Sequence, residues 1–127
     1  MDPIADMLTK IRNAQVVKKK TVAIPYTRLK YDLAKILAKE GFIEEIQKRG
    51  TKCKRIIIRL KYQNNRPRIH GIKRISKLSQ RVYLKKKKLY SPKSGYGILI
   101  VSTPKGLLTS KEARKINVGG EAICEVW

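Results

Sequence analysis

Acidic side chains are scarce in this chain of 127 residues. The sequence has 9 Asp and Glu against 31 Lys and Arg, which gives a formal net charge of +22. Between Glu45 and Glu112 there is no acid, although residues 46–111 carry 20 Lys or Arg. A basic surface that served only solubility would mix both signs. This field indicates a polyanionic partner. Nucleic acid comes first, because phosphate contacts release counterions, and an anionic membrane surface comes second.

Cysteine and histidine are nearly absent. Cys53 and Cys124 lie 71 positions apart in strand-like runs, a pattern that fits neither a zinc site nor a disulfide framework, so we expect two small buried hydrophobes. The single histidine, His70, stands in a strand-like run, and the few carboxylates do not pair usefully. A nuclease would need an acidic metal-binding cluster or a pair of histidines. We therefore predict no enzyme activity, no bound metal and no cofactor.

Long apolar runs and phosphate-loop motifs are also missing. No apolar stretch approaches the roughly 18 residues of a membrane span. The opening residues 1–3 enter a helix without the character of a signal or transit peptide. The glycines at 95–97 and 119–120 lack the flanking residues of a nucleotide-binding loop, so we expect them to make turns. These absences predict no membrane association and retention in the compartment of synthesis.

Helical spacing and capping residues organise the first half of the chain. Asp2 and Pro3 are typical of an N-cap and a first helical position, and apolar residues then recur at helical spacing: Ile4, Met7, Leu8, Ile11 and Ala14. A short strand is expected over 21–25. Thr27 then caps a second helix that ends at Gly41 and has the apolar stripe Leu29, Leu33, Ile36 and Leu37. Two strands follow, over 42–47 and from a turn at 49–50 to near residue 62. In the second of these strands, apolar residues alternate with Lys and Arg, so one face is expected to be core and the other cationic.

Turn-forming residues over 63–68 are typical of a linker. Beyond it, short strands are expected at 69–75, 81–84, 96–101 and 121–127. One helix interrupts them: it begins at the capping-box spacing of Thr109 and Glu112 and ends before 118–120. The sequence therefore predicts an α+β fold. An N-terminal α-β-α-β-β subdomain (1–62) and a linker (63–68) precede a mostly β, RNA-binding subdomain with one short helix (69–127).

Two segments of the second half are candidates for binding nucleic acid. The run Lys85–Lys88 lies beside Tyr83 and Tyr90, which places phosphate-seeking cations next to flat rings; a solvated loop is the alternative. The segment 102–106, Ser-Thr-Pro-Lys-Gly, follows a fully apolar strand and is rich in donors. Such a loop suits folded RNA, where 2′-hydroxyls and splayed bases are within reach; an ordinary strand-to-helix turn is the alternative.

At these residues the chain resembles a known family, ribosomal protein S-eight, the eighth protein of the small ribosomal subunit, of the bacterial and organellar type. The resemblance rests on the opening run 2–14 (DPIADMLTKIRNA), on the helix-to-strand junction 40–43 (EGFI), and on a C-terminal signature. That signature runs from Gly97 through 102–106, Thr109 and Ala113 to 119–121 and 124–127. The resemblance covers essentially the whole chain.

The resemblance implies a two-part, non-enzymatic protein that binds the central domain of small-subunit ribosomal RNA directly and early in assembly. Neighbouring small-subunit ribosomal proteins are further implied partners. Members in bacteria also tend to repress translation of their own operon through a similar RNA element. We expect a monomer outside the ribosome and a ribosomal location, in the cytoplasm of a bacterium or in a plastid.

The resemblance places the central RNA contact in 102–106, assisted by 119–121, with Glu121 as an acceptor for base or sugar donors. The full set of predicted RNA-binding residues is Arg12, Asn13, Arg81, Tyr83, Lys85, Lys86, Lys87, Lys88, Ser102, Thr103, Lys105, Gly106, Thr109, Gly119, Gly120 and Glu121. This chain departs from the family at Pro104, where a third hydroxyl is usual, and at Leu78-Ser79, where a Pro-Gly turn is usual.

Two other classes of cation-rich protein fit less well. A DNA-compacting protein would have a dimerisation helix pair or a groove-inserting arm. A protein of the membrane surface would have an amphipathic helix with lysines on one face and bulky apolar residues on the other. Here the cations concentrate on expected strands and loops, which favours a ribosomal RNA scaffold.

Overall fold

The computed structural model describes residues 2–127, which divide into two compact units. One unit is residues 3–69. The other is residues 70–127 together with Asp2, whose carboxylate lies 3.0 Å from the Nε of Arg74. The boundary falls between Ile69 and His70, after the segment 63–68 that the sequence suggested as a linker.

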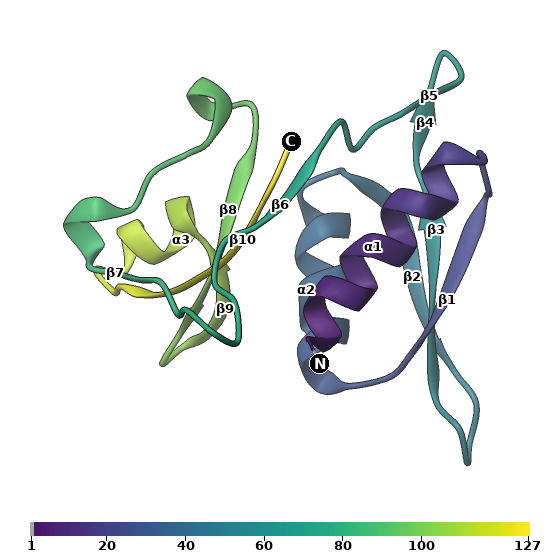
Figure 1. Ribbon diagram of the computed structural model, residues 1–127, viewed down its shortest axis with the longest axis horizontal. Coiled ribbons are helices and arrows are strands. Elements are labelled where there is room, and N and C mark those ends of the chain that lie inside the picture. The colour runs from purple at the N-terminus through teal and green to yellow at the C-terminus, as the bar shows by residue number, and fades with distance from the viewer. Residues whose placement is uncertain (1) are drawn as a thin grey trace. The chain divides into compact units, whose positions relative to one another are not determined.

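The unit of residues 3–69 is a small antiparallel sheet with two helices. Its elements are α1 (Pro3–Val16), β1 (Thr21–Pro25), α2 (Arg28–Lys39), β2 (Ile43–Arg49), β3 (Arg55–Leu60), β4 (Tyr62–Gln63) and β5 (Arg66–Pro67). The strand order is β1-β3-β2, and both helices lie on one side of this sheet (Figure 1). The predicted α-β-α-β-β order is confirmed.

The helices of this unit follow their sequence signals closely. All five apolar residues predicted for the first helix are buried. Thr27 caps α2 by accepting a hydrogen bond from the Lys30 N–H, and Gly41 ends it with φ +81°. The Phe42 N–H returns to the Leu37 carbonyl, the bonding of a Schellman C-cap. The expectation for Leu29 was wrong: this side chain, in the first turn of α2, is 45% exposed.

The segment 63–68, which the sequence suggested as a linker, has regular structure of its own. β4 and β5 pair as a short hairpin, and Asn64 and Asn65 both have positive φ at its turn. Asparagine tolerates this left-handed conformation better than most residues, and two such residues in succession form the tight turn that matches strand twist. The turn-formers thus make a hairpin that belongs to the residue 3–69 unit.

The unit of residues 70–127 is mostly β, with one short helix, as predicted. Its elements are β6 (Ile72–Arg74), β7 (Tyr83–Leu84), β8 (Ile98–Thr103), β9 (Gly106–Thr109), α3 (Ser110–Lys115) and β10 (Gly120–Val126). Two 3₁₀ turns lie at Lys86–Lys88 and Lys93–Gly95. The strand order is β6-β10-β8-β9, and β7 also pairs with β10. Leu89, Leu99, Val101, Ala113 and Ala122 form a buried cluster between this sheet and α3.

Sequence reasoning missed strand β9, and this changes the nature of the candidate segment 102–106. Ser102 and Thr103 end β8, Gly106 begins β9, and only Pro104 and Lys105 lie in the turn between them. The segment is therefore the tip of a β-hairpin and not a loop that leads from a strand to a helix.

The two cysteines have different environments. Cys124 is buried, as predicted, and its burial raises the pKa of the thiol to about 12. The expectation for Cys53 was wrong: it is exposed in the turn between β2 and β3. Among residues 2–127 no helix is long and apolar enough to cross a membrane. Within the same residues, no three of His, Cys, Asp and Glu gather where they could hold a metal ion.

Candidate nucleic-acid interface

The tip of the β8–β9 hairpin is held by its own side chains. The Thr103 hydroxyl accepts a hydrogen bond from the Lys105 N–H (3.1 Å) and donates to the Gly106 carbonyl (2.8 Å). Gly106 has φ +107°, whereas Pro104 and Lys105 do not have positive φ. A type I turn followed by a left-handed glycine is a common hairpin connection. Thr103 therefore stabilises the turn, and Lys105 is left exposed at its tip.

Strand register brings three predicted residues into one row across the sheet. Glu121 of β10 lies directly opposite Ser102 of β8 on one side and Tyr83 of β7 on the other. Directly opposed residues in antiparallel strands point to the same face. Val101, the neighbour of Ser102, is buried against α3, so the row Tyr83–Glu121–Ser102 faces away from that helix.

The members of this row are chemically complementary. Tyr83 is 70% exposed, which leaves its ring available for stacking. The Ser102 hydroxyl is partly exposed and has no hydrogen-bond partner within residues 2–127. Glu121 supplies a carboxylate between them. The row therefore offers a π surface, an acceptor and a free hydroxyl side by side, within the roughly 10 Å that two strand spacings cover.

Gly119 and Gly120 allow this row to form, and their role is close approach rather than the turn-making that the sequence suggested. A Cβ on Gly120 would lie 2.1 Å from the Ser102 carbonyl oxygen, and one on Gly119 would lie 2.4 Å from the Leu84 carbonyl oxygen. Neither glycine has a positive φ. They let β10 lie close to the hairpin on one side and to the start of the lysine run on the other.

Glu121 is a structural anchor as well as a candidate ligand. Its Oε2 accepts hydrogen bonds from the Ser76 hydroxyl (2.6 Å) and from Arg81 (3.0 Å), and the Val82 N–H donates to the same Ser76 hydroxyl (3.0 Å). Burial raises the pKa of the Glu121 carboxyl. Two hydrogen bonds, from Ser76 and Arg81, and the positive charges of Arg81 and Arg74 lower it by more, so the pKa lies below its ordinary value. Glu121 is thus ionised at neutral pH and fixes the chain just before Tyr83.

Residues 70–127 are rich in cations, and their acids are engaged in internal hydrogen bonds. Residues 70–127 hold 13 Lys and Arg against three acids. Glu112 closes the α3 capping box, Glu121 binds Ser76 and Arg81, and Glu125 accepts a hydrogen bond from Tyr90. The four lysines of the run 85–88 are all exposed, and three of them form a 3₁₀ turn directly after β7. The surface of the unit is therefore strongly cationic.

Thr109 lies outside this row. It is only 3% exposed, and its hydroxyl and N–H are both engaged with Glu112 in the capping box. The segment at Leu78-Ser79, where the family pattern is broken, forms a tight turn closed by mutual backbone hydrogen bonds of Lys77 and Gln80. Arg81 and then β7 follow directly after this turn.

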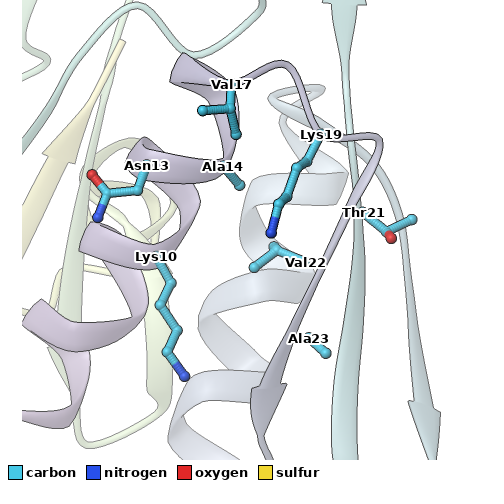
Figure 2. A pocket seen from close by; sticks show the side chains of 8 residues that line it. All are labelled: Lys10, Asn13, Ala14, Val17, Lys19, Thr21, Val22 and Ala23. Carbon is cyan, nitrogen blue, oxygen red and sulfur yellow. The ribbon is translucent and has the colours of Figure 1, made fainter.

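Arg12 and Asn13 lie in the other unit, on the exposed side of α1. Asn13 lines an open groove of about 630 Å³ between α1 and β1. Figure 2 shows the side chains of Lys10 and Lys19 reaching into this space from the helix and from the segment before β1. Ala14, Val17, Thr21, Val22 and Ala23 complete the lining. The groove therefore combines two ammonium groups with a mainly apolar floor.

Sequence reasoning missed several residues of these surfaces. Ser76 is fully buried and links Glu121 to the chain before β7, but one serine among many carries no signal in a sequence. Lys10 and Lys19 belong to a chain crowded with lysines. Of the residues that line the groove, Asn13 was predicted to bind RNA, whereas Lys10 and Lys19 were not.

Comparison with known proteins finds relatives that match nearly the whole chain. The ribosomal protein S8 family matches residues 2–127. The small ribosomal subunit protein uS8 of Vesicomyosocius okutanii is 50% identical over 127 residues, covering 99% of this chain and 97% of the relative. The uS8 proteins of Mycoplasmopsis pulmonis and Trichormus variabilis are 52% and 46% identical, each covering 99% of this chain and at least 96% of the relative. The family is one of structural ribosomal proteins, so the prediction of a non-enzymatic protein is confirmed. The chain belongs to the ribosomal protein S8 family.

Proposed function

We propose that this protein is a structural constituent of the small ribosomal subunit that binds subunit ribosomal RNA directly, through the unit of residues 70–127. The row Tyr83–Glu121–Ser102 carries the proposal. It sets an exposed ring, an ionised carboxylate and an unpartnered hydroxyl side by side in the segment 70–127, which holds 13 Lys and Arg against three acids.

The residues divide into those that give affinity and those that give specificity. Lys105 and the lysines of 85–88 attract phosphates of any sequence. In the row, Tyr83 stacks against an unpaired base, Ser102 donates to or accepts from a base edge or 2′-hydroxyl, and the second oxygen of Glu121 accepts from an amino or hydroxyl group. Duplex DNA has no 2′-hydroxyl and keeps its bases stacked, so the row selects folded RNA.

The groove between α1 and β1 supports the same function from the residue 3–69 unit. Lys10 and Lys19 would hold backbone phosphates, and Asn13 would donate to a neighbouring sugar. Pro25 lacks an N–H and lies on edge strand β1, which disfavours an added peptide strand along it. The chemistry of the groove thus suits an RNA backbone.

Regulation follows from the same recognition. A hairpin in messenger RNA that presents an unpaired base beside a helical backbone would satisfy the row as ribosomal RNA does. Such binding would repress translation of the operon that encodes the protein, as the family resemblance implies. Neighbouring proteins of the small subunit would pack against surfaces that the RNA leaves free.

Titration of the full chain against a folded central-domain fragment of ribosomal RNA and against a DNA duplex of matched charge tests the proposal. Both titrations use one salt concentration, because affinity for any polyanion depends steeply on salt. We expect the preference for the RNA to be well above tenfold, where tenfold corresponds to about 1.4 kcal/mol of binding free energy. A preference of tenfold or less would mean that lysine attraction alone explains binding, and would overturn specific recognition.

A further inference from the structure

A second aromatic and cationic surface lies on the residue 3–69 unit and uses none of the residues that line the groove. The rings of Tyr26 and Tyr31 lie 5.8 Å apart, centroid to centroid, at an angle of 50°. The Lys48 ammonium lies 5.0 Å from the Tyr26 centroid and 5.7 Å from that of Tyr31, and the Lys35 ammonium also lies 5.7 Å from the Tyr31 centroid. We call Tyr26, Tyr31, Lys35 and Lys48 the tyrosine–lysine cluster.

Backbone hydrogen bonds and strand register position three members of this cluster. Tyr26 follows β1, and its N–H donates to the Lys54 carbonyl (3.0 Å). Tyr31 lies in the first turn of α2, where its N–H donates to the Thr27 carbonyl (2.9 Å). Lys48 of β2 lies opposite the buried Ile56, so it stands on the helix-covered face of the sheet. The Lys48 ammonium reaches the rings while its stem follows apolar surface.

Both lysines keep their charge available to an anion. Within residues 2–127 neither forms an ion pair, and Asp32, the only acid of α2, pairs with neither of them. Their cations are held near the rings by cation–π attraction, which leaves their outer sides open to a further anion. The turn that joins β2 to β3 adds the exposed cations Arg49, Lys52, Lys54 and Arg55, with no acid among residues 46–61.

We infer that the tyrosine–lysine cluster binds an unpaired nucleotide of RNA, with its base against a tyrosine ring and its phosphate on Lys48 and Lys35. The inference rests on the proposed function, because that function supplies RNA as the partner. A nucleotide matches both features of the cluster: every base has a π face, and aromatic stacking beside a cationic track is how proteins hold single strands. An acidic peptide would use the two ammonium groups but would leave the rings without a matching flat surface. The cations of the turn between β2 and β3 would contact further phosphates of the same RNA strand.

The test measures binding of the full chain to a fluorescent single-stranded oligouridine RNA by anisotropy. Replacing both rings with leucine (Tyr26→Leu with Tyr31→Leu) keeps apolar bulk but removes the π faces, and should weaken binding about tenfold. The matched control is Tyr96→Leu, because Tyr96 is 84% exposed on the other unit; it should bind as the unchanged protein does. The pair Tyr26→Phe with Tyr31→Phe keeps the rings and should retain affinity.

Three results would overturn the inference: no binding of the oligouridine by the unchanged protein, no loss in the leucine pair, or an equal loss in the phenylalanine pair. A polyglutamate peptide that displaces the RNA from the unchanged protein at equal charge would instead indicate an acidic partner.

If the leucine pair unfolds, cross-linking of a 4-thiouridine oligomer to the unchanged protein decides, and cross-links outside residues 26–54 would count against the cluster. Binding of the folded ribosomal RNA fragment is measured alongside. A retained preference for it shows that the proposed function stands even where this site fails.

Discussion

Replacement of Gly120 by alanine tests whether close approach of strands builds the row Tyr83–Glu121–Ser102, which we propose binds RNA. The added Cβ would lie 2.1 Å from the Ser102 carbonyl oxygen and 2.9 Å from the Ser102 carbonyl carbon, both of which are backbone atoms. The difference between 2.1 Å and the 3.4 Å of an ordinary contact is about 1.3 Å. β8 and β10 must part by a distance of that order at this row, because neither atom belongs to a flexible side chain.

A displacement of this size has two consequences. It lengthens the hydrogen bonds of the β8–β10 ladder beyond useful range at the row, and overpacking of this kind typically costs about 1–3 kcal/mol. It also moves Ser102 away from Glu121 and so separates the hydroxyl from the carboxylate with which we propose it recognises one RNA element. We expect Gly120→Ala to lose about 2 kcal/mol of unfolding free energy and most of its preference for folded RNA, while non-specific binding to polyanions remains.

Gly95→Ala is the matched control. Gly95 has φ +93°, so a side chain there is strained and costs about 1–2 kcal/mol, but a Cβ would meet nothing within 4 Å. This variant should therefore lose a similar amount of stability while keeping its RNA preference. Urea unfolding followed by circular dichroism gives the stabilities, and competition between folded and bulk RNA gives the preference. If Gly120→Ala keeps both, or if Gly95→Ala loses the preference equally, the reasoning about the row is refuted.

Three further predictions concern the capping box, the lysine run and the anchor of the row. Thr109→Ala should lose about 1 kcal/mol of unfolding free energy because it removes the N-cap of α3, while the folded fraction keeps its RNA affinity. A loss of affinity in titration that exceeds the loss of stability would mean that Thr109 contacts RNA. Lys85→Ala with Lys87→Ala should lower the slope of log affinity against log salt by up to about 1.8 without changing RNA preference, and an unchanged slope would place both lysines away from RNA. Because the pKa of Glu121 is lowered, its contribution to stability is complete above the ordinary carboxyl pKa and is lost as pH falls through the lowered value. Glu121→Gln should therefore flatten the acid side of the curve of unfolding free energy, measured in urea, against pH. An unaltered acid side would show that this carboxylate does not stabilise the fold.

Much of the fold could be predicted because its signals are local. The start of α2 at Thr27, its end at Gly41 and the capping box at Thr109 each depend on residues within one helical turn, and all three are confirmed. Strand β9 was missed because its four residues run directly into the capping box, so the helix signal masked them. Leu29 fits an apolar helical stripe by spacing, but it lies in the first turn of α2 and is 45% exposed, and spacing alone does not show where along a helix the buried face begins.

The residues of the candidate site could be named from the sequence, but the arrangement of that site could not. Its geometry depends on register between segments far apart in sequence: Ser76 meets Glu121 across 45 positions, and Tyr83 stands opposite the same Glu121. No local pattern encodes such pairing. The sequence also predicted both Ser102 and Thr103 as RNA-binding residues, and only the turn geometry shows that Thr103 bonds its own backbone while Ser102 has no partner within residues 2–127.

The single variant Ser102→Ala tests the central claim most directly, by competition between a folded central-domain ribosomal RNA fragment and bulk RNA. The Ser102 hydroxyl has no partner within residues 2–127, so stability should change by less than about 0.5 kcal/mol. Affinity for the fragment should fall by about 1.5–3 kcal/mol, because a buried donor or acceptor on the RNA is left unpaired, while binding to bulk RNA stays unchanged. An equal loss of both affinities, or no loss of either, would contradict recognition of ribosomal RNA through this row.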